Sequence, residues 1–316
     1  MSEKKLIAVT GATGAQGGGL VRAILADPTG GFAVRAITRK PDSDAARALA
    51  AAGAEVVAAD TDDPATLDRA FAGAYGVFCV TNFWEHLDVP REQRQARAMA
   101  QATKRAGVKH VVWSTLEDTR KDVPLDDGRL PTLYGKYKVP HFDSKGEMDA
   151  VFATEGAPTS FLKAAFYWEN FIYFGMGPRA GADGSLTLAM ALGGAKLPGI
   201  AAGDIGKAAY GIFRRGPATA GQYFGVAGDS LSGPEMAAAM SAALGRTITF
   251  QDVPFDVFRG LGFPGAEDLG NMFQHHQLMG EAFQRARDPK ATRELDASVK
   301  TFAQWLGANA SRIPIA

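Results

Sequence analysis

The stretch Gly11-Ala12-Thr13-Gly14-Ala15-Gln16-Gly17 directly follows the apolar run Leu6-Ile7-Ala8-Val9-Thr10. Its glycines stand at GxxGxxG spacing, after a predicted strand and before a predicted helix. The first glycine permits a tight turn, the second lets the backbone approach a pyrophosphate, and the third lets the helix pack closely on the strand. A phosphate would then face the helix N-terminus, where unpaired N–H groups favour negative charge. The stretch therefore predicts a dinucleotide-binding turn of the Rossmann type.

Short apolar runs alternate with helical periods throughout the first half of the chain. Such alternation predicts βαβ units around a parallel sheet. Strands are expected at residues 6–10, 33–38, 55–59, 76–81, 108–114 and 159–163. Helices are expected at residues 17–26, 44–52, 64–71, 91–106 and 141–154, with Asp63 as an N-cap before Pro64. The predicted fold class is α/β, with a doubly wound parallel sheet.

The pattern changes after Tyr167, where glycine and proline become more frequent and the regular alternation stops. We expect residues 1–166 to form a Rossmann domain, with residues 200–216 returning to it. Residues 167–316 are expected to form a smaller α+β domain for a substrate or partner. The polar stretch 120–139 has no clear period and contains several prolines and glycines, so we expect a loop beside the site.

The balance of charge limits the classes of partner. The 316 residues include 34 basic and 34 acidic side chains, and no basic stripe is visible. Nucleic acid and anionic membrane surfaces usually require such an excess, so we expect neither as a partner. Cys79 is the only cysteine, which excludes an intrachain disulfide and suits a reducing compartment. The apolar run before Gly11 is too short for a signal peptide or a membrane span, so we expect a cytoplasmic protein.

The end of the second predicted strand distinguishes the two nicotinamide cofactors. An Asp or Glu there binds the ribose 2′-hydroxyl of NAD, whereas an Arg accommodates the 2′-phosphate of NADP. The sequence has Thr38-Arg39-Lys40, with no carboxylate before Asp42. Arg39 offers a planar fork for a phosphate and Lys40 a second charge, so we predict NADP(H) over NAD(H). The alternative is a pair of solvated charges after an exposed strand end.

Two other features have competing interpretations. Asp60, at the end of the third predicted strand, fits either a neighbour of the adenine or a cap of the turn to Asp63. His275-His276 suggests a metal site, but adjacent helical residues point about 100° apart and no Cys or Asp/Glu cluster accompanies them. We therefore expect no metal.

Four motifs together resemble the NmrA-like family, and within it the HSCARG-type redox sensors. They are Gly11 to Gly18, Thr81-Asn82-Phe83-Trp84-Glu85, His141-Phe142-Asp143-Ser144-Lys145-Gly146-Glu147 and Leu261-Gly262-Phe263-Pro264-Gly265-Ala266-Glu267-Asp268-Leu269. This family belongs to the atypical short-chain dehydrogenases. The resemblance implies a Rossmann domain followed by a smaller C-terminal domain.

The resemblance also implies roles for individual positions. The stretch Gly11 to Gln16 corresponds to the pyrophosphate contacts, and Arg39 and Lys40 to the 2′-phosphate side. The remaining positions implied to contact cofactor are Asp60 and Thr61 at the adenine, Thr81, Asn82 and Phe83 at the nicotinamide ribose, Lys145, and Tyr167, Trp168, Glu169 and Asn170 at the nicotinamide end. A family lysine falls on Arg94 here, which keeps the charge and changes the geometry.

Short-chain dehydrogenases reduce carbonyls with a Tyr-xxx-Lys pair on one helical turn and a Ser at the end of the fifth strand. The Tyr donates a proton, the Lys lowers its pKa, and the Ser polarises the carbonyl. Ser114 has the position of that serine, although it could equally satisfy backbone groups at the strand end.

Two pairs compete for the Tyr-xxx-Lys position. Tyr134 and Lys138 have the spacing, but the following Pro140 disfavours helical geometry before it. His141 and Lys145 come directly after Pro140, where a helix can begin. On this alignment His141 replaces the catalytic tyrosine. His141 could act as a proton donor near neutral pH, or it could be a core or capping residue. Lys145 could serve as an acid or a base if burial lowers its pKa.

These observations support two functional hypotheses. One is an NADPH/NADP+ sensor or regulator with little or no turnover, motivated by the resemblance and by His141. The other is an NADPH-dependent oxidoreductase for a small apolar acceptor such as a quinone or an enone, in which the cofactor carries the hydride. The tentative catalytic residues are Lys145, His141 and Ser114. A regulatory protein partner and the oligomeric state stay open.

Overall fold

A computed structural model describes residues 4–315. In this part of the chain, a seven-stranded parallel sheet has the order β11-β6-β5-β4-β1-β2-β3. Its strands are β1 (Lys5–Val9), β2 (Phe32–Thr38), β3 (Glu55–Ala58), β4 (Gly76–Cys79), β5 (His110–Thr115), β6 (Thr159–Lys163) and β11 (Tyr223–Gly225). Ile7 and Val9 pack on one face and Ala8 on the other. Burial of both faces explains the near-continuous apolar runs of these strands.

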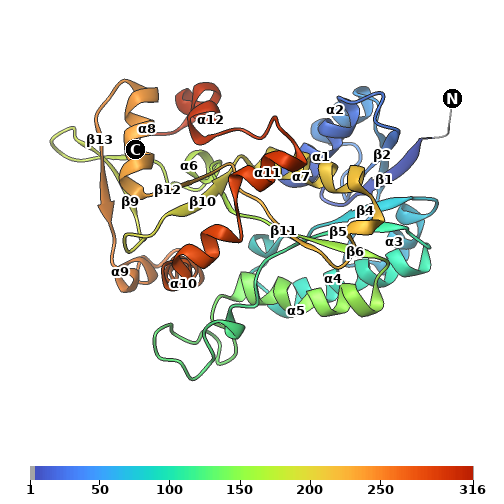
Figure 1. The fold of residues 1–316 in the computed structure, drawn as a ribbon, viewed down its shortest axis with the longest axis horizontal. Coiled ribbons are helices and arrows are strands. Elements are labelled where there is room, and N and C mark those ends of the chain that lie inside the picture. Colours follow the sequence, from blue (N-terminus) through green and yellow to red (C-terminus); the bar gives the residue numbers. More distant parts are fainter. Residues whose placement is uncertain (1–3, 316) are drawn as a thin grey trace.

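Helices cover both faces of this sheet. They are α1 (Ala15–Leu25), α2 (Asp44–Ala51), α3 (Pro64–Phe71), α4 (Val89–Arg105), α5 (Pro140–Glu155) and α7 (Ala202–Arg215). The helices α1 and α7 share one apolar core with the sheet, and α3, α4 and α5 share the core on the opposite face. Figure 1 shows α1 and α7 above the sheet, with α4 and α5 below it. The predicted doubly wound Rossmann fold is thus confirmed.

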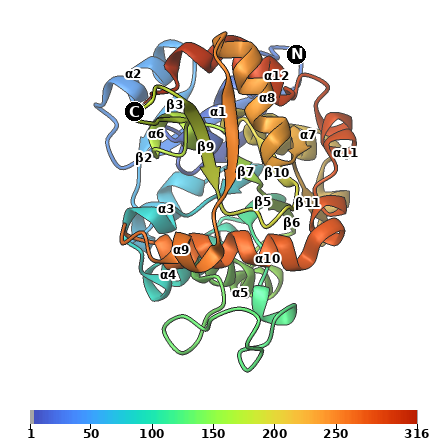
Figure 2. The ribbon, with the colours of Figure 1, turned by 90° about the vertical axis from the view of Figure 1, so that its left-hand side faces the viewer.

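The second part of the chain forms two three-stranded sheets, with the orders β12-β10-β7 and β13-β9-β8. Its elements are β7 (Phe166–Tyr167), α6 (Asn170–Tyr173), β8 (Arg179–Ala180), β9 (Leu186–Met190), β10 (Leu197–Ile200), β12 (Asp229–Leu231), α8 (Gly233–Leu244), β13 (Ile248–Asp252), α9 (Phe255–Arg259), α10 (Ala266–Arg285), α11 (Pro289–Leu295) and α12 (Phe302–Asn309). Figure 2 shows β9 and β13 side by side, with α9 and α10 crossing near one end of them.

The edge strand β11 is formed by residues 223–225. These residues lie beyond the segment 200–216, which the sequence predicts to belong to the first domain. It pairs in parallel with β6, and Tyr223 stacks on Phe161 with ring centroids 4.6 Å apart. A three-residue strand has no room for a period of its own, so sequence patterning does not detect it. The helix α7 lies in the same core as α1. The central sheet therefore includes a segment from far along the chain. The division of the chain into two domains stays a prediction.

Caps explain where two of the helices begin. Asp63 accepts a hydrogen bond from Ala65 N–H and precedes Pro64, as predicted for α3. Asp88 accepts from Arg91 N–H at 3.0 Å, so α4 begins at Val89, two residues before the predicted start. A proline in the first helical turn is compatible with both starts, because N–H groups there lack a partner inside the helix.

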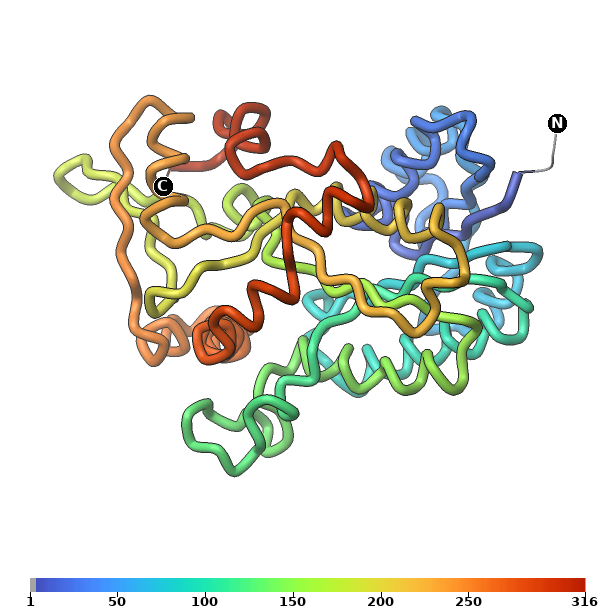
Figure 3. The backbone as a smooth tube through the Cα atoms, viewed as in Figure 1, coloured from blue at the N-terminus to red at the C-terminus, as the bar shows by residue number. Residues whose placement is uncertain are grey.

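The predicted loop 120–139 contains the end of a short 3-10 turn, Thr119–Lys121, and an isolated antiparallel bridge between Leu133 and Tyr137. Figure 3 shows this segment extending away from the main body beside the start of α5. Within residues 4–315, no helix is both long and apolar enough to cross a membrane.

Candidate functional site

The glycine turn has the geometry that its spacing predicts. Gly11 adopts a left-handed backbone conformation with φ of +60°, which suits a residue without a Cβ. A Cβ on Gly17 would lie 2.4 Å from the carbonyl oxygen of Gly11, so only glycine lets α1 approach β1 this closely. Gly14 is the N-cap of α1 and provides no side-chain cap. The turn therefore depends on the left-handed conformation of Gly11 and on the close approach of Gly14 and Gly17 to the Gly11 carbonyl.

The same turn presents unpaired donors. No backbone hydrogen bond within the described chain engages the N–H groups of Thr13, Ala15 or Gln16. Thr13, Gly14 and Ala15 are exposed, whereas Ala12 is buried and donates its N–H to the Ile37 carbonyl. The first turn of α1 also contains no acidic residue. The N-terminus of α1 thus fits an anionic group such as a pyrophosphate.

Gln16 joins the glycine turn to two other predicted residues. The Ser114 hydroxyl donates to Gln16 Oε1 at 2.8 Å, and Gln16 Nε2 donates to the Tyr167 hydroxyl. Burial raises the pKa of Tyr167 to about 12, although the Gln16 hydrogen bond acts in the opposite direction. Ser114 is 2% exposed. The structure therefore brings Ser114, Gln16 and Tyr167 together, with the Ser114 proton engaged by the glycine turn.

Arg39 at the end of β2 forms a bidentate ion pair with Glu85. Its two terminal nitrogens lie 2.6 and 3.0 Å from the two carboxylate oxygens. Glu85 belongs to a short 3-10 turn, Phe83–Glu85, that follows β4. Lys40 is exposed. Sequence reasoning did not identify Glu85 as a partner of Arg39, because nothing local indicates that residues 46 positions apart meet.

The turn after β3 is capped by its own acidic residue. Asp60 Oδ1 accepts a hydrogen bond from Asp62 N–H at 3.0 Å, so the capping interpretation of Asp60 is confirmed, while the adenine contact stays a prediction. Thr61 lies partly buried in the same turn. Arg94 is exposed on α4, and the described chain provides no ion pair or hydrogen bond for its side chain.

Lys145 on α5 reaches the loop after β4. Its Nζ atom lies 2.8 Å from Glu92 Oε1 and donates to the Thr81 carbonyl at 3.2 Å and to the Thr81 hydroxyl at 2.5 Å. Burial opposes ionisation of Glu92, but the charge and hydrogen bond of Lys145 lower the pKa of this carboxyl. The predicted residues Lys145 and Thr81 are thus in contact. Glu92 is a further member of this cluster that sequence reasoning missed.

His141 lies one helical turn before Lys145 and is held from the second part of the chain. Its Nδ1 donates to Asp268 Oδ1 at 2.6 Å, and its backbone N–H donates to Asp268 Oδ2 at 3.1 Å. The ring packs against Trp84, with centroids 4.8 Å apart, and against the buried Phe83 at 6.1 Å. No hydrogen bond within the described chain engages Nε2. His141 is therefore fixed in orientation with one ring nitrogen uncommitted.

The competing pair Tyr134 and Lys138 does not lie on a helix. Tyr134 has a positive φ of 52° and is 74% exposed. Lys138 is buried, and its Nζ donates to the carbonyls of Asp127 and Leu130. Pro140 begins α5, as its restriction on the preceding residue predicts. The choice of His141 and Lys145 over this pair agrees with the structure.

The run Tyr167 to Asn170 divides among different surroundings. Trp168 is 2% exposed and packs on Phe302 and Trp305, so its ring belongs to the core of the second part. Glu169 accepts from Ala202 N–H at 2.8 Å and from Trp305 Nε1 at 3.1 Å, which caps the N-terminus of α7. Asn170 begins α6 and is partly buried. Asn82 is exposed before the turn at Phe83. Of the residues from Tyr167 to Asn170, Tyr167 is the one whose side chain forms a hydrogen bond with the glycine turn within the described chain.

The His275-His276 pair on α10 is buried. His275 Nε2 donates to Asp122 at 3.1 Å, and neither ring nitrogen of His276 has a hydrogen-bond partner in the part of the chain that the structure describes. Burial lowers the pKa of His276 well below its ordinary value, with help from the charges of His275 and Arg287. Among residues 4–315, no group of three or more His, Cys, Asp or Glu side chains is arranged to hold a metal ion.

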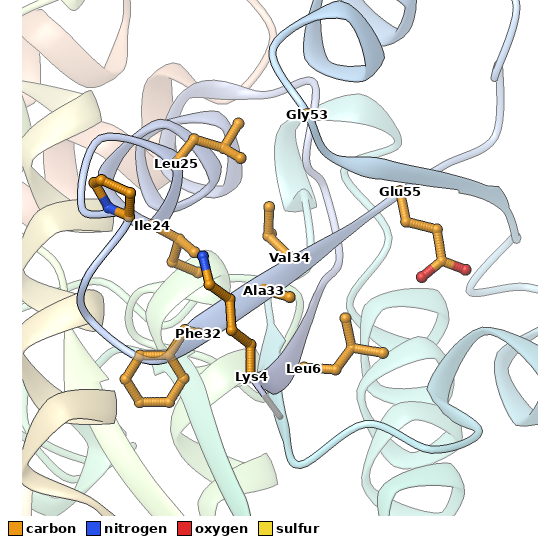
Figure 4. A pocket seen from close by; sticks show the side chains of 10 residues that line it. Lys4, Leu6, Ile24, Leu25, Phe32, Ala33, Val34, Gly53 and Glu55 are labelled. Carbon is orange, nitrogen blue, oxygen red and sulfur yellow. The ribbon is translucent and has the colours of Figure 1, made fainter. Parts of the chain in front are cut away.

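A separate pocket of about 260 Å³ lies at the opposite edge of the sheet (Figure 4). Leu6, Phe32 and Val34 line it together with Ile24 of α1, and Glu55 lies at its border. These residues mark the amino ends of β1, β2 and β3. Ligands of doubly wound sheets bind at the carboxyl ends, so this pocket is not part of the predicted dinucleotide site.

Comparison with known proteins identifies relatives over most of the chain. The model of the NmrA-like family matches residues 3–306. An NmrA-like family domain-containing oxidoreductase, FrzB of Cladobotryum sp, is 30% identical over 87% of this chain and 84% of its own length. An NAD(P)H azoreductase of Xenophilus azovorans is 30% identical over 97% of this chain and 98% of its own.

Solved structures share the fold at lower identity. NmrA, a negative transcriptional regulator crystallised with NADP, is 23% identical, with a TM-score of 0.75 over 97% of this chain and 95% of its own. The triphenylmethane reductase of Citrobacter sp., complexed with NADP(H), is 21% identical, with a TM-score of 0.75 over 96% and 99%. The predicted resemblance is confirmed by the family match, and the chain belongs to the NmrA-like family.

Proposed function

We propose that this protein is an NADP(H)-dependent oxidoreductase that reduces a small, flat, apolar acceptor such as a quinone, an enone or an azo compound. The observation that carries the proposal is the His141–Asp268 pair one helical turn before Lys145. Names of the relatives support it, because FrzB is called an oxidoreductase and the Xenophilus protein an azoreductase.

The cofactor would lie along the carboxyl edge of the sheet. The unpaired N–H groups at the N-terminus of α1 would receive the pyrophosphate, and Arg39 with Lys40 the 2′-phosphate. Lys145, held against the loop after β4 by Thr81 and Glu92, would contact the nicotinamide ribose. When bound, NADPH supplies the hydride.

The protein's own task is then to supply a proton. Asp268 accepts from Nδ1 of His141, which fixes the ring orientation and leaves Nε2 as the ring nitrogen that can exchange a proton with an acceptor. A proton carried on Nε2 would have no protein acceptor within the described residues. The neighbouring rings of Trp84 and Phe83 give an apolar surrounding that suits a flat acceptor. His141 is therefore the proposed proton donor.

The test is NADPH oxidation with a panel of quinones, enones and azo compounds, comparing the native chain with His141→Gln and Lys145→Ala. We expect turnover of at least one acceptor, and a decrease in kcat of about 10 to 100-fold in His141→Gln with unchanged NADPH affinity. If the native chain oxidises NADPH no faster than Lys145→Ala with every acceptor in the panel, the proposal is excluded.

A redox sensor is the second candidate, and a specific observation favours it. The groups that would perform carbonyl chemistry in a short-chain dehydrogenase are engaged by the protein itself: the Ser114 hydroxyl donates to Gln16, and the Lys145 ammonium is paired with Glu92. For a sensor, the cofactor must bind two conformations with different affinity. The segments 81–90 and 120–139, next to these residues, are the expected places of change.

Limited proteolysis distinguishes the two candidates. A sensor should show altered cleavage within 81–90 or 120–139 when NADPH replaces NADP+, at concentrations that saturate the protein. Equal cleavage in the two states, together with turnover of an acceptor, would leave the oxidoreductase as the function.

A further inference from the structure

The Arg39–Glu85 pair joins the two loops that flank the glycine turn. In the central sheet β1 lies between β2 and β4. Arg39 follows β2, Glu85 follows β4, and the turn that begins at Gly11 follows β1. The ion pair therefore connects the loops on either side of the carboxyl end of β1. A dinucleotide bound at the glycine turn would meet this pair.

The guanidinium of Arg39 is occupied at the end that a phosphate would use. Both terminal nitrogens contact Glu85, which is the bidentate geometry that arginine also offers to phosphates. Hydrogen bonding to Glu85 raises the pKa of Arg39, and the nearby charges of Asp60 and Asp62 add to this shift. Acidic groups thus surround the side chain that the sequence assigns to the 2′-phosphate.

The pair is nevertheless placed where it can open. The side chains of Arg39 and Glu85 are 51% and 40% exposed, so water can replace either partner. Exposed ion pairs contribute little to stability because both charges are well solvated when they separate. Arg39 can therefore exchange Glu85 for another anion without disturbing the core.

We propose that Glu85 is a specificity-determining residue of the dinucleotide site, because its carboxylate competes with the 2′-phosphate for Arg39. The inference rests on the proposed function. NADPH must displace Glu85 and accept a negative charge near its phosphate, whereas NADH, which has no 2′-phosphate, leaves the pair in place. The preference for NADPH is consequently smaller than Arg39 and Lys40 alone would give, and both dinucleotides bind.

The experiment is a titration with NADPH and with NADH of the native chain, of Glu85→Gln and of Glu55→Gln, followed by energy transfer from tryptophan to the reduced nicotinamide. Glu55 is the matched control: it pairs with Arg35 at 2.9 Å, its side chain is 51% exposed, and it lies at the start of β3, at the opposite edge of the sheet. Removing either carboxylate changes the net charge of the protein equally.

We expect Glu85→Gln to bind NADPH about tenfold more tightly and NADH within threefold of the native chain, with Glu55→Gln unchanged for both. Equal changes for the two dinucleotides, or none, would overturn the role of Glu85 and leave the proposed function standing. If neither dinucleotide binds to the native chain or to any variant, the proposed function is wrong and the inference falls with it.

Discussion

Two Arg–Glu pairs in this protein have the same bidentate geometry in opposite surroundings. Arg39 contacts Glu85 at 2.6 and 3.0 Å near the surface, and Arg287 contacts Glu117 at 2.8 and 2.7 Å in the interior. The Arg287 side chain is 0% exposed, whereas that of Arg39 is 51% exposed. Water can stand in for a lost partner only at the exposed pair. The comparison indicates that Arg39 can exchange Glu85 for another anion, whereas Arg287 and Glu117 hold two segments of the chain together permanently.

The surroundings of Arg287 strengthen this contrast. Its Nε donates to the Ala164 carbonyl at 2.8 Å, and the guanidinium lies 4.0 Å from the ring centroid of Phe283. Arg287 follows α10, and Glu117 follows β5. The buried pair therefore attaches the second part of the chain to the central sheet, and all the polar contacts of the guanidinium are internal.

The largest predicted effect comes from breaking the buried pair. Among the described residues, Arg287→Met leaves Glu117 with Lys163, at 3.4 Å, as its one cationic partner, so we expect the free energy of unfolding to fall by about 3 to 5 kcal/mol. Urea denaturation measures it. The double variant Arg287→Met/Glu117→Leu should recover most of the loss, because no uncompensated buried charge remains. If the free energy of unfolding falls by less than about 1 kcal/mol in Arg287→Met, the buried pair is no more important for stability than the exposed pair.

The second prediction concerns acid. Burial opposes ionisation of Glu117, but the charges of Arg287 and Lys163 lower its pKa to about 2 from an ordinary 4.5. A group with a lowered folded pKa contributes stability above its unfolded pKa and loses it as pH falls toward the folded value. We expect Glu117 to contribute about 3 kcal/mol above pH 4.5 that disappears toward pH 2. Glu117→Gln should have a flatter stability profile over this range.

The third prediction is a gain in stability from the carboxyl of Asp149, at which burial outweighs the favourable neighbours. Burial raises the pKa of Asp149 to about 6, against the hydrogen bonds of Thr115, Tyr223 and Trp113 and the charge of Lys163. The folded state then binds more protons than the unfolded state between pH 4 and 6, so stability falls as pH rises through this range. Asp149→Asn keeps the oxygen that accepts from Thr115 and Trp113, and it should stabilise the protein by about 1 to 2 kcal/mol at pH 7. No gain at pH 7 would contradict the raised pKa.

The smallest predicted effect concerns the contribution of the exposed Arg39–Glu85 pair to stability. Glu85→Gln should change the free energy of unfolding by less than about 0.5 kcal/mol, because an exposed pair contributes little. Thermal unfolding without ligand measures this change, with Glu55→Gln as the control. Destabilisation above about 1 kcal/mol would mean that the Arg39–Glu85 pair also holds the loops after β2 and β4 together in the folded protein.

Local patterns predicted the features of this protein that depend on neighbouring residues. The glycine turn, the start of α5 at Pro140 and the cap at Asp63 follow from adjacent side chains and backbone limits. The alternation of apolar runs likewise predicted the parallel sheet, because each strand is buried on both faces.

Contacts between distant segments were not predictable from one sequence. Asp268 meets His141 across 127 positions, and Glu85 meets Arg39 across 46. Neither contact follows from spacing, because the topology that brings these loops together is set by strand order. The motif that contains Asp268 did contribute to the family resemblance, which was the one signal that pointed to it.

The edge strand β11 has a consequence for how the molecule folds. The central sheet needs residues 223–225 to cover β6, so it cannot be completed until the polypeptide has been synthesised well past α7. Pairing across such a sequence separation carries a large loop-closure entropy and slows folding. Until it forms, β6 exposes unpaired backbone groups that can recruit other chains. Nascent chains that stall between residues 216 and 222 are therefore expected to aggregate.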